Sequence, residues 1–182
     1  MIGAITAGLY AGGVPPVTNS YESIATVTVG SGGSATVSFT SIPSTFTHLQ
    51  VRILWKPNSG TNLVGNFNSD TGSNYKAHEL YGDGSSASSF VPSVSPNGIA
   101  LGYNGGSTQF GTTILDILDY ANVNKNTTTR SLFGDDRNGS GEVSLDSGLW
   151  MNTAAVTRID FKLQNSGNIQ EYSSFALYGI KG

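Results

Sequence analysis

The feature that most constrains the fold is a two-residue alternation of apolar and polar side chains in the stretch THLQVRILWK, residues 47–56. Its apolar members are Leu49, Val51, Ile53 and Trp55. Because successive side chains of a β-strand point to opposite faces, this alternation predicts a strand with one buried face and one solvated or interfacial face. Pro57 ends the predicted strand, since proline cannot donate to the ladder.

The same period recurs through most of the chain after residue 20. The stretches SYESIATVTVG and SATVSFTSI lie on either side of a glycine-rich turn at residues 30–33 and predict a β-hairpin. Further strands are expected at residues 63–68, 75–81, 99–103, 110–120, 128–133, 143–150, 155–163 and 175–180. The run TTILDILDY also fits a helical face, but its leading threonines and its β surroundings favour a strand.

Many short strands separated by turn sequences predict an all-β fold. Asn138-Gly139 is a strong signal for a tight turn, and NSGTN and QNSGN separate other strands. We therefore expect residues 21–182 to form a single antiparallel β-sandwich, jelly-roll-like in its architecture. Residues 82–98, GDGSSASSFVPSVSPNG, predict a long loop over one end of the sandwich, where binding sites often lie.

Residues 1–20 have a different composition, rich in glycine and alanine with a Pro15-Pro16 pair. Such a segment forms no core by itself; it is either a frayed terminus or, as we expect, an extended arm docked on a neighbouring subunit. Its isolated apolar side chains, the expected partner contacts, are Ile2, Ile5, Leu9, Tyr10 and Val14. Without a positively charged start, and with glycines interrupting its apolar residues, it is a poor signal peptide, so we expect synthesis and folding in a cytoplasm.

Composition excludes several classes of function. The chain has no cysteine and two histidines, which rules out disulfides, thiol chemistry and a multi-histidine zinc site. Only 12% of residues are charged, the net charge is -3, and no basic stripe or long apolar run is present, so we expect neither nucleic acid nor membrane as a partner. A weakly charged surface favours association, which fits a subunit of an assembly.

Two acidic or amide-rich turns are candidate cation sites. In GNFNSDTGSNYKAHELYGDGSSASS, residues 65–89, Asn66, Asn68 and Asp70 alternate like calcium ligands, but Gly72 comes one residue late and Ala77 replaces the final glutamate. We therefore favour a turn over a calcium site and expect no metal or other cofactor.

The second such turn is FGDDRNGSGE, which clusters Asp135, Asp136 and Glu142. A cation site is the alternative here too. The cluster is interpreted as a solvated hairpin tip that Arg137 partly neutralises.

No motif for nucleophilic catalysis is present, and we expect no enzyme. The sequence contains no G-x-S-x-G elbow, and His78 lies beside Glu79 in a predicted strand, where neighbours face opposite sides. Carboxylate pairs suited to glycoside cleavage, Asp116 with Asp119 or Asp70 with Glu79, stay open as a weaker alternative.

Several aromatic residues lie near polar amides and are candidates for stacking against sugars. Half of them alternate with expected core positions and are explained by packing. Tyr81 and Tyr103 flank the predicted long loop, which makes them candidate contacts for a glycan or a protein partner.

Three segments in a fixed order resemble a family of small virion structural proteins of tailed bacteriophages and prophages. They are VSFTSIPSTFTHLQVRILWK, FNSDTGSNYKAHELYGDGSSASS, and SGLWMNTAAVTRIDFKL with SSFALYGIKG. The Ser-Ile-Pro turn at residues 41–43, the spaced Phe-Asn-x-Asp-x-Gly-x-Asn-Tyr signature at 67–75 and the closing Leu-Tyr-Gly-Ile at 177–180 carry the resemblance.

The resemblance implies a β-sandwich accessory protein of the phage particle, with no catalytic residues to carry over. A single compact domain with an apolar arm and no repeat shaft suits a capsid decoration, or cement, protein; the alternative is a carbohydrate-binding module of a tail fibre or tail tip. The expected partners are the major capsid protein or other virion proteins, together with further copies of the chain in a dimer or trimer. The expected location is the virion, assembled in the host cytoplasm.

Overall fold

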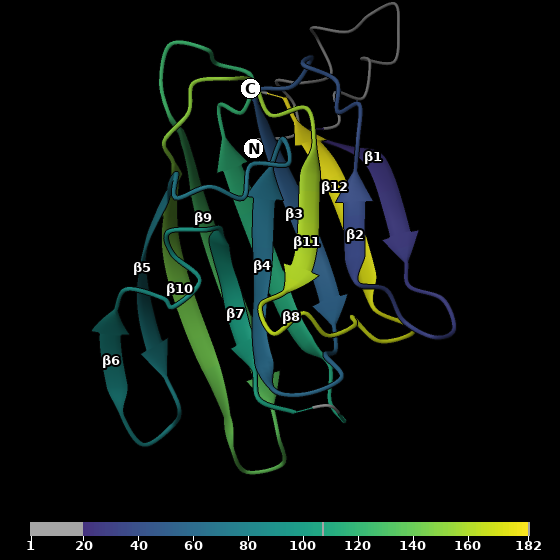
Figure 1. The fold of residues 1–182 in the computed structure, drawn as a ribbon, viewed down its shortest axis with the longest axis vertical. Helices are drawn as coiled ribbons and strands as arrows, with labels where there is room; N and C mark the ends of the chain where they lie inside the picture. Colours follow the sequence, from purple (N-terminus) through teal and green to yellow (C-terminus); the bar gives the residue numbers. More distant parts are fainter. Residues whose placement is uncertain (1–19, 107, 182) are drawn as a thin grey trace, which may run out of the picture.

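The computed structural model describes residues 20–106 and 108–181, which form an all-β sandwich of two antiparallel sheets, as predicted (Figure 1). The predicted arm contacts Ile2, Ile5, Leu9, Tyr10 and Val14 lie outside the described residues. Within those residues, no helix combines the length and the apolar character that a membrane crossing requires.

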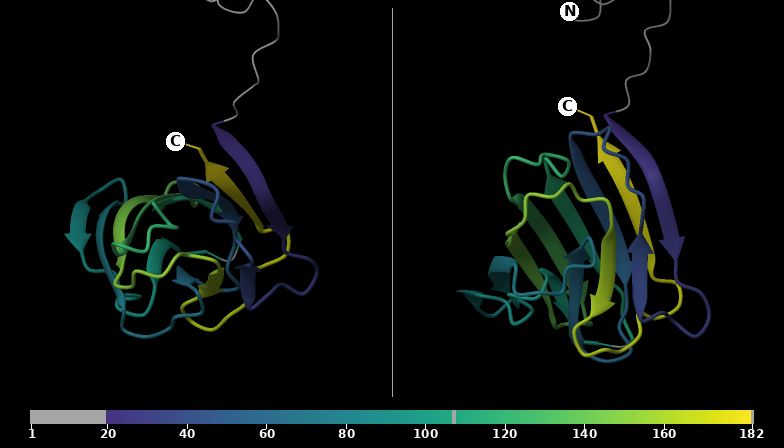
Figure 2. Two further views of the ribbon diagram at one scale, coloured as in Figure 1. Left: turned by 90° about the horizontal axis from the view of Figure 1, so that it is seen from above. Right: turned by 45° about the horizontal axis from the view of Figure 1, so that its top comes forward.

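The larger sheet has eight strands in the order β1-β12-β3-β8-β9-β10-β5-β6. Its strands are β1 (Tyr21–Thr28), β3 (His48–Trp55), β5 (Tyr75–Gly82), β6 (Ala87–Phe90), β8 (Gly111–Leu118), β9 (Thr127–Asp136), β10 (Gly141–Trp150) and β12 (Ser174–Ile180). The order places β6 and β1 at opposite edges, which Figure 2 shows on opposite sides of the molecule.

The smaller sheet has four strands in the order β2-β11-β4-β7. Its strands are β2 (Thr36–Phe39), β4 (Thr61–Phe67), β7 (Ile99–Asn104) and β11 (Ile159–Leu163). The cluster of Val64, Val94 and Ala100 packs together outside the main core, so residues from the segment after β6 help to shield this sheet.

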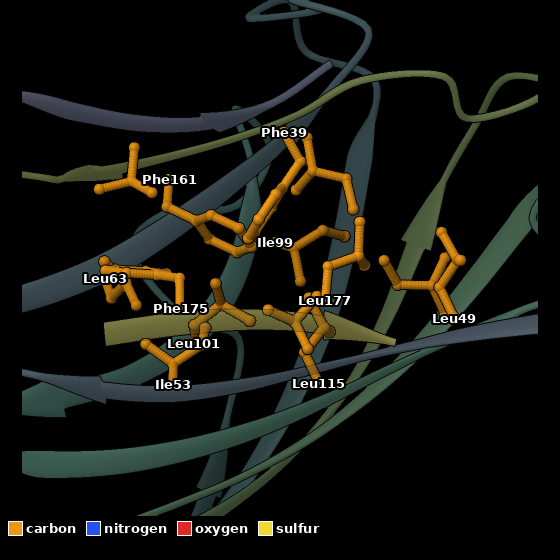
Figure 3. Packing of buried hydrophobic residues seen from close by; sticks show 14 of the residues in the cluster. Phe39, Leu49, Ile53, Leu63, Ile99, Leu101, Leu115, Phe161, Phe175 and Leu177 are labelled. Atoms are coloured by element: carbon orange, nitrogen blue, oxygen red, sulfur yellow. The ribbon is translucent and has the colours of Figure 1, made fainter. Parts of the chain in front are cut away.

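The main core lies between the two sheets (Figure 3). The predicted alternation in β3 is confirmed, because its four apolar members are all buried while Arg52 and Leu54 between them are exposed. From the larger sheet, Leu115, Phe175 and Leu177 face the core; Figure 3 shows them near residues of the smaller sheet such as Phe161. Burial of such side chains contributes roughly 1.5–3 kcal/mol each.

The predicted hairpin at the start of the sandwich is wrong. β1 pairs with β12 in the larger sheet, whereas β2 pairs with β11 in the smaller one. The residues between β1 and β2, with Gly32 and Gly33 at positive φ, therefore carry the chain from one sheet to the other instead of closing a two-strand turn.

The predicted long loop at residues 82–98 contains a strand. β6 pairs with β5, with Glu79 opposite Phe90 and Tyr81 opposite Ser88. All four β6 residues are exposed, so this strand lacks the apolar alternation by which strands are recognised in a sequence.

Candidate functional site

A pocket of 320 Å³ lies where the edge of the smaller sheet meets β5, β6 and β10 of the larger one. It is lined by Asn62, Glu79, Tyr81, Phe90, Pro92, Ser93, Tyr103 and Glu142. Both predicted contact residues, Tyr81 and Tyr103, thus line one cavity although they come from different sheets. We call it the tyrosine pocket.

The aromatic side chains of the tyrosine pocket come from three strands. The rings of Tyr81 and Phe90 meet edge to face, with centroids 5.9 Å apart and an angle of 70° between their planes. Tyr103 lies opposite Asn62 in the β4–β7 register and is 40% exposed, while Phe90 is 45% exposed. Exposed aromatic rings at the rim of a cavity offer apolar faces to a ligand.

Two glutamates contribute carboxylates to the same pocket. Glu79 is on the core-facing side of β5, as Tyr81 is, and is only 8% exposed. Among the described residues its carboxylate has no hydrogen-bond or ion-pair partner, and burial raises its pKa. Burial, and then the neighbouring Asp135 carboxylate, raise the pKa of Glu142 to about 7 although Arg137 lies 3.5 Å away.

Further carboxylates extend this acidic region beneath the pocket. Asp146 lies opposite Glu79 in the β5–β10 register and is 2% exposed. Its Oδ2 accepts hydrogen bonds from the hydroxyls of Ser131 and Ser144, whereas its Oδ1 has no hydrogen-bond partner in the described structure. Burial, followed by the nearby Glu79 carboxylate, raises the pKa of Asp146 to about 7.

The interpretation of FGDDRNGSGE as a solvated tip is only partly right. Asn138 and Gly139 form the predicted turn at positive φ, and Asp136 is exposed beside it. However, the side chain of Asp135 is fully buried and pairs with Arg137 Nε at 2.9 Å. The carboxylate of Glu142 is also largely buried, because this end of the β9–β10 hairpin packs against the edge of the smaller sheet at Tyr103.

The amide-rich stretch after β4 forms a turn, which is the interpretation that the sequence favoured over a calcium site. Asp70 accepts hydrogen bonds from the indole of Trp150, the amide of Asn74 and the backbone N–H of Gly72. Asn68 has a positive φ, and its Oδ1 accepts from the backbone N–H of Arg158. The Asp70 carboxylate and Oδ1 of Asn68 are therefore directed at protein donors, whereas Oδ1 of Asn66 is buried without a hydrogen-bond partner in the described structure. In the described ranges, no group of three or more His, Asp or Glu is placed to hold a metal ion.

The carboxylate pairs considered for glycoside cleavage have separate partners. Asp116 pairs with Arg130 at 3.0 Å, and Asp119 contacts Lys125 and His48. Asp70 belongs to the turn after β4, and it does not line the tyrosine pocket that contains Glu79.

The outward face of the larger sheet carries an apolar row that the sequence reading missed. Leu80, Leu145, Leu132 and Ile114 lie in register across β5, β10, β9 and β8. They are 54%, 46%, 49% and 42% exposed, respectively. The sequence does hint at this row through pairs of consecutive apolar residues, Ile114-Leu115 and Leu132-Phe133. Because neighbouring side chains of a strand point to opposite faces, each pair places one apolar side chain in the core and one on the outer surface. We call these four residues the outer row.

The sequence reading also missed Phe90 and Glu142 as pocket residues. The sequence predicts a loop at Phe90 and a solvated hairpin tip at Glu142. Phe90 is placed beside Tyr81 by the β5–β6 pairing, whereas Glu142 meets Tyr103 only where the two sheets come together, which no local pattern encodes. Comparisons with protein family models, with curated proteins and with solved structures found no match for this chain.

Proposed function

We propose that this protein is a structural subunit of a tailed bacteriophage virion, a capsid decoration protein that attaches to the shell through the outward face of its larger sheet. The observation that carries the proposal is the outer row. Contiguous apolar side chains on the surface of a sandwich mark a protein interaction site rather than a solvated face. The order of the three sequence segments that resemble virion proteins supports placing that interaction in a phage particle.

The charges around the outer row indicate the chemistry of the shell surface that it fits. Arg52 is opposite Ile114 in the register and continues the row, and its guanidinium lies 5.0 Å from the ring centre of Tyr178. Arg130 and Lys76 are exposed on the same face, where Asp116 neutralises one cation. The face is therefore apolar with a positive fringe, although the whole chain has a net charge of -3. An apolar shell surface bordered by carboxylates is complementary to it.

Attachment through many copies does not require a strong individual contact. A decoration protein occupies symmetry-related positions, so weak interfaces act together once neighbouring copies touch. The predicted arm at residues 1–20 provides a second contact to an adjacent shell subunit. In this proposal the arm extends the contact to the neighbouring subunit, while the outer row forms the apolar centre of the interface.

Binding of full-length protein to purified shells of the encoding phage tests the proposal. Leu132→Asp places a charge in the centre of the outer row, and we expect at least a tenfold loss of sedimentation with shells. Val123→Asp is the matched control, because Val123 is 59% exposed in the connection between β8 and β9, away from the row. Deletion of residues 1–20 is expected to leave a folded sandwich that no longer binds.

Circular dichroism shows whether each variant keeps the β-sheet spectrum of the parent protein. Equal binding of the Leu132→Asp and parent proteins to shells would show that the outer row is not part of the interface. Binding to shells that is retained after deletion of residues 1–20 would show that the arm is not needed for attachment.

A tail-tip receptor-binding module is the second candidate, favoured by the meeting of Tyr81 and Tyr103 in one cavity. Under this alternative, the isolated protein binds saccharides and has no affinity for shells. The two candidates are separated by where the protein is found in the particle.

A further inference from the structure

We propose that the tyrosine pocket is a saccharide site selective for sugars without negative charge. The inference concerns a ligand rather than the location of the protein in a particle, so it stands whether the protein decorates a capsid or a tail.

The dimensions and lining of the pocket fit a monosaccharide unit. Its volume is 320 Å³, at the lower end of the range of roughly 300–1,000 Å³ for small-molecule sites. Tyr81 and Phe90 hold each other edge to face, so Phe90 is supported although it is nearly half exposed. Tyr103 lies on the other sheet, so aromatic side chains line the cavity from two sides. A sugar ring presents C–H groups that pack on such faces.

Glu79 contributes a carboxylate that no protein group in the described ranges satisfies. Glu79 as a residue is 8% exposed, and a carboxylate in such surroundings normally has protein partners, because an unsatisfied buried polar group costs about 1–3 kcal/mol or more. Glu79 has none in the described structure, and it lines the cavity from the inner side of β5. The donors that would satisfy it must therefore come from solvent or from a ligand, and sugar hydroxyls are donors of the required kind.

The remaining polar groups are suited to the same ligand. Asn62 and Ser93 also line the pocket, and both belong to a chain of hydrogen bonds through Gln164. Their amide and hydroxyl groups donate and accept, which matches the dual character of a hydroxyl. The carboxylate and amide groups around the cavity can thus bind the hydroxyls of a sugar, while the aromatic rings pack against its C–H groups.

The local charge determines which sugars fit. Glu79 and Glu142 line the cavity, and Asp146 and Asp135 lie behind them, against one cation at Arg137. Because burial raises the pKa of Glu142 and of Asp146 to about 7, these carboxyl groups are fully charged only above that pH. There, a uronic or sialic acid would bring another carboxylate beside like charges and be repelled. Neutral hexoses and N-acetylhexosamines avoid this repulsion.

A glycan array probed with the labelled full-length protein tests the proposal. The array carries neutral hexose and N-acetylhexosamine oligosaccharides beside versions that contain uronic or sialic acid. We expect binding to neutral saccharides only, and titration with the best of them then measures the variants. Tyr81→Ala and Tyr103→Ala are each expected to weaken binding about tenfold or more.

Two further variants separate a ligand contact from a structural effect. Glu79→Gln keeps the size of the side chain but removes its charge, so we expect weaker binding of the neutral sugar together with a smaller penalty for the acidic ones. Tyr172→Ala is the matched control, because Tyr172 is 69% exposed outside the pocket and its loss should change nothing.

The proposal is overturned by any of three results. The first is an array on which no saccharide binds, or on which acidic sugars bind best. The second is tighter binding of tetramethylammonium than of any sugar, which would show that the aromatic and acidic side chains hold an organic cation. The third is neutral-sugar binding that survives both tyrosine substitutions unchanged.

Discussion

The indole N–H of Trp150 donates a hydrogen bond to Oδ2 of Asp70 at 2.8 Å, which joins the end of β10 to the turn after β4. The two residues come from opposite layers of the sandwich. The Trp150 ring is 1% exposed, stacks on Tyr75 and packs against Phe67, so the bond fixes a corner of the core. A turn that resembles a calcium loop in sequence therefore has a structural role.

Asp70→Ala should lower the free energy of unfolding by about 1–3 kcal/mol, because it leaves a buried indole N–H without an acceptor. Chemical denaturation of the parent and variant measures the difference. Asp70→Asn retains an oxygen acceptor and should lose less. Equal stability of Asp70→Ala and parent would show that the Trp150 contact is unimportant.

Gly102 in β7 of the smaller sheet packs directly against Phe133 of the larger one. Its φ is +101°, and a Cβ there would meet Phe133 Cγ at 2.1 Å. Gly102→Ala should therefore destabilise the protein strongly, by several kcal/mol or roughly the cost of an overpacked core.

Gly84→Ala is the control for the effect of φ alone, since Gly84 has φ +85° and no neighbouring atom within 4 Å of its added Cβ. Thermal unfolding of the two variants should give a much lower midpoint for Gly102→Ala. Similar midpoints would mean that backbone strain, rather than the contact with Phe133, dominates.

Stability should fall as the pH rises from about 4 to 7. Burial raises the pKa of Asp146 and of Glu142 to about 7, so the folded protein keeps these protons while the unfolded chain releases them near its ordinary carboxyl pKa. The folded state binds more protons in this window, and the stabilisation present at low pH is lost as the pH passes through the folded pKa values.

Asp146→Asn tests the source of this pH dependence. Its unfolding midpoint should change less between pH 4.5 and pH 8 than that of the parent protein. The Asp70 carboxylate works in the opposite direction, because the hydrogen bonds from Trp150 and then Asn74 lower its pKa, but its effect lies below about pH 4. An identical pH profile in the parent and Asp146→Asn proteins would exclude Asp146.

The outer row should contribute little to folding. Leu132→Ala is expected to cost less than about 1 kcal/mol, because Leu132 is already half exposed. Leu115→Ala, on the core side of the adjacent strand with no exposed surface, should cost about 2–5 kcal/mol. Comparable losses in denaturation experiments would mean that the outer row is covered in the isolated protein.

Local alternation predicted most of the strands because each one buries a single face. The run at residues 47–56 and the ambiguous run TTILDILDY both became strands of the larger sheet. Pairing was less predictable: the two strands beside Gly30 belong to different sheets, since the connection with Gly32 and Gly33 at positive φ carries the chain from one sheet to the other.

The candidate site was predictable only in part. Tyr81 and Tyr103 are predictable as contacts because they flank a polar segment of the sequence, and both line one cavity. Phe90 joins Tyr81 through the local β5–β6 pairing, which the sequence hides because β6 is exposed along its whole length. Glu142 and Tyr103 come together only where the two sheets meet, a long-range relationship that composition and periodicity do not reveal. The outer row is likewise visible only once the register of β5, β10, β9 and β8 is known.

The most direct test of the central claim is to locate the protein in purified particles of the encoding phage, by attaching a gold label to the protein and imaging the particles by electron microscopy. The account predicts label distributed over the capsid shell at regular positions. Label confined to the tail, or particles that lack the protein altogether, would contradict it.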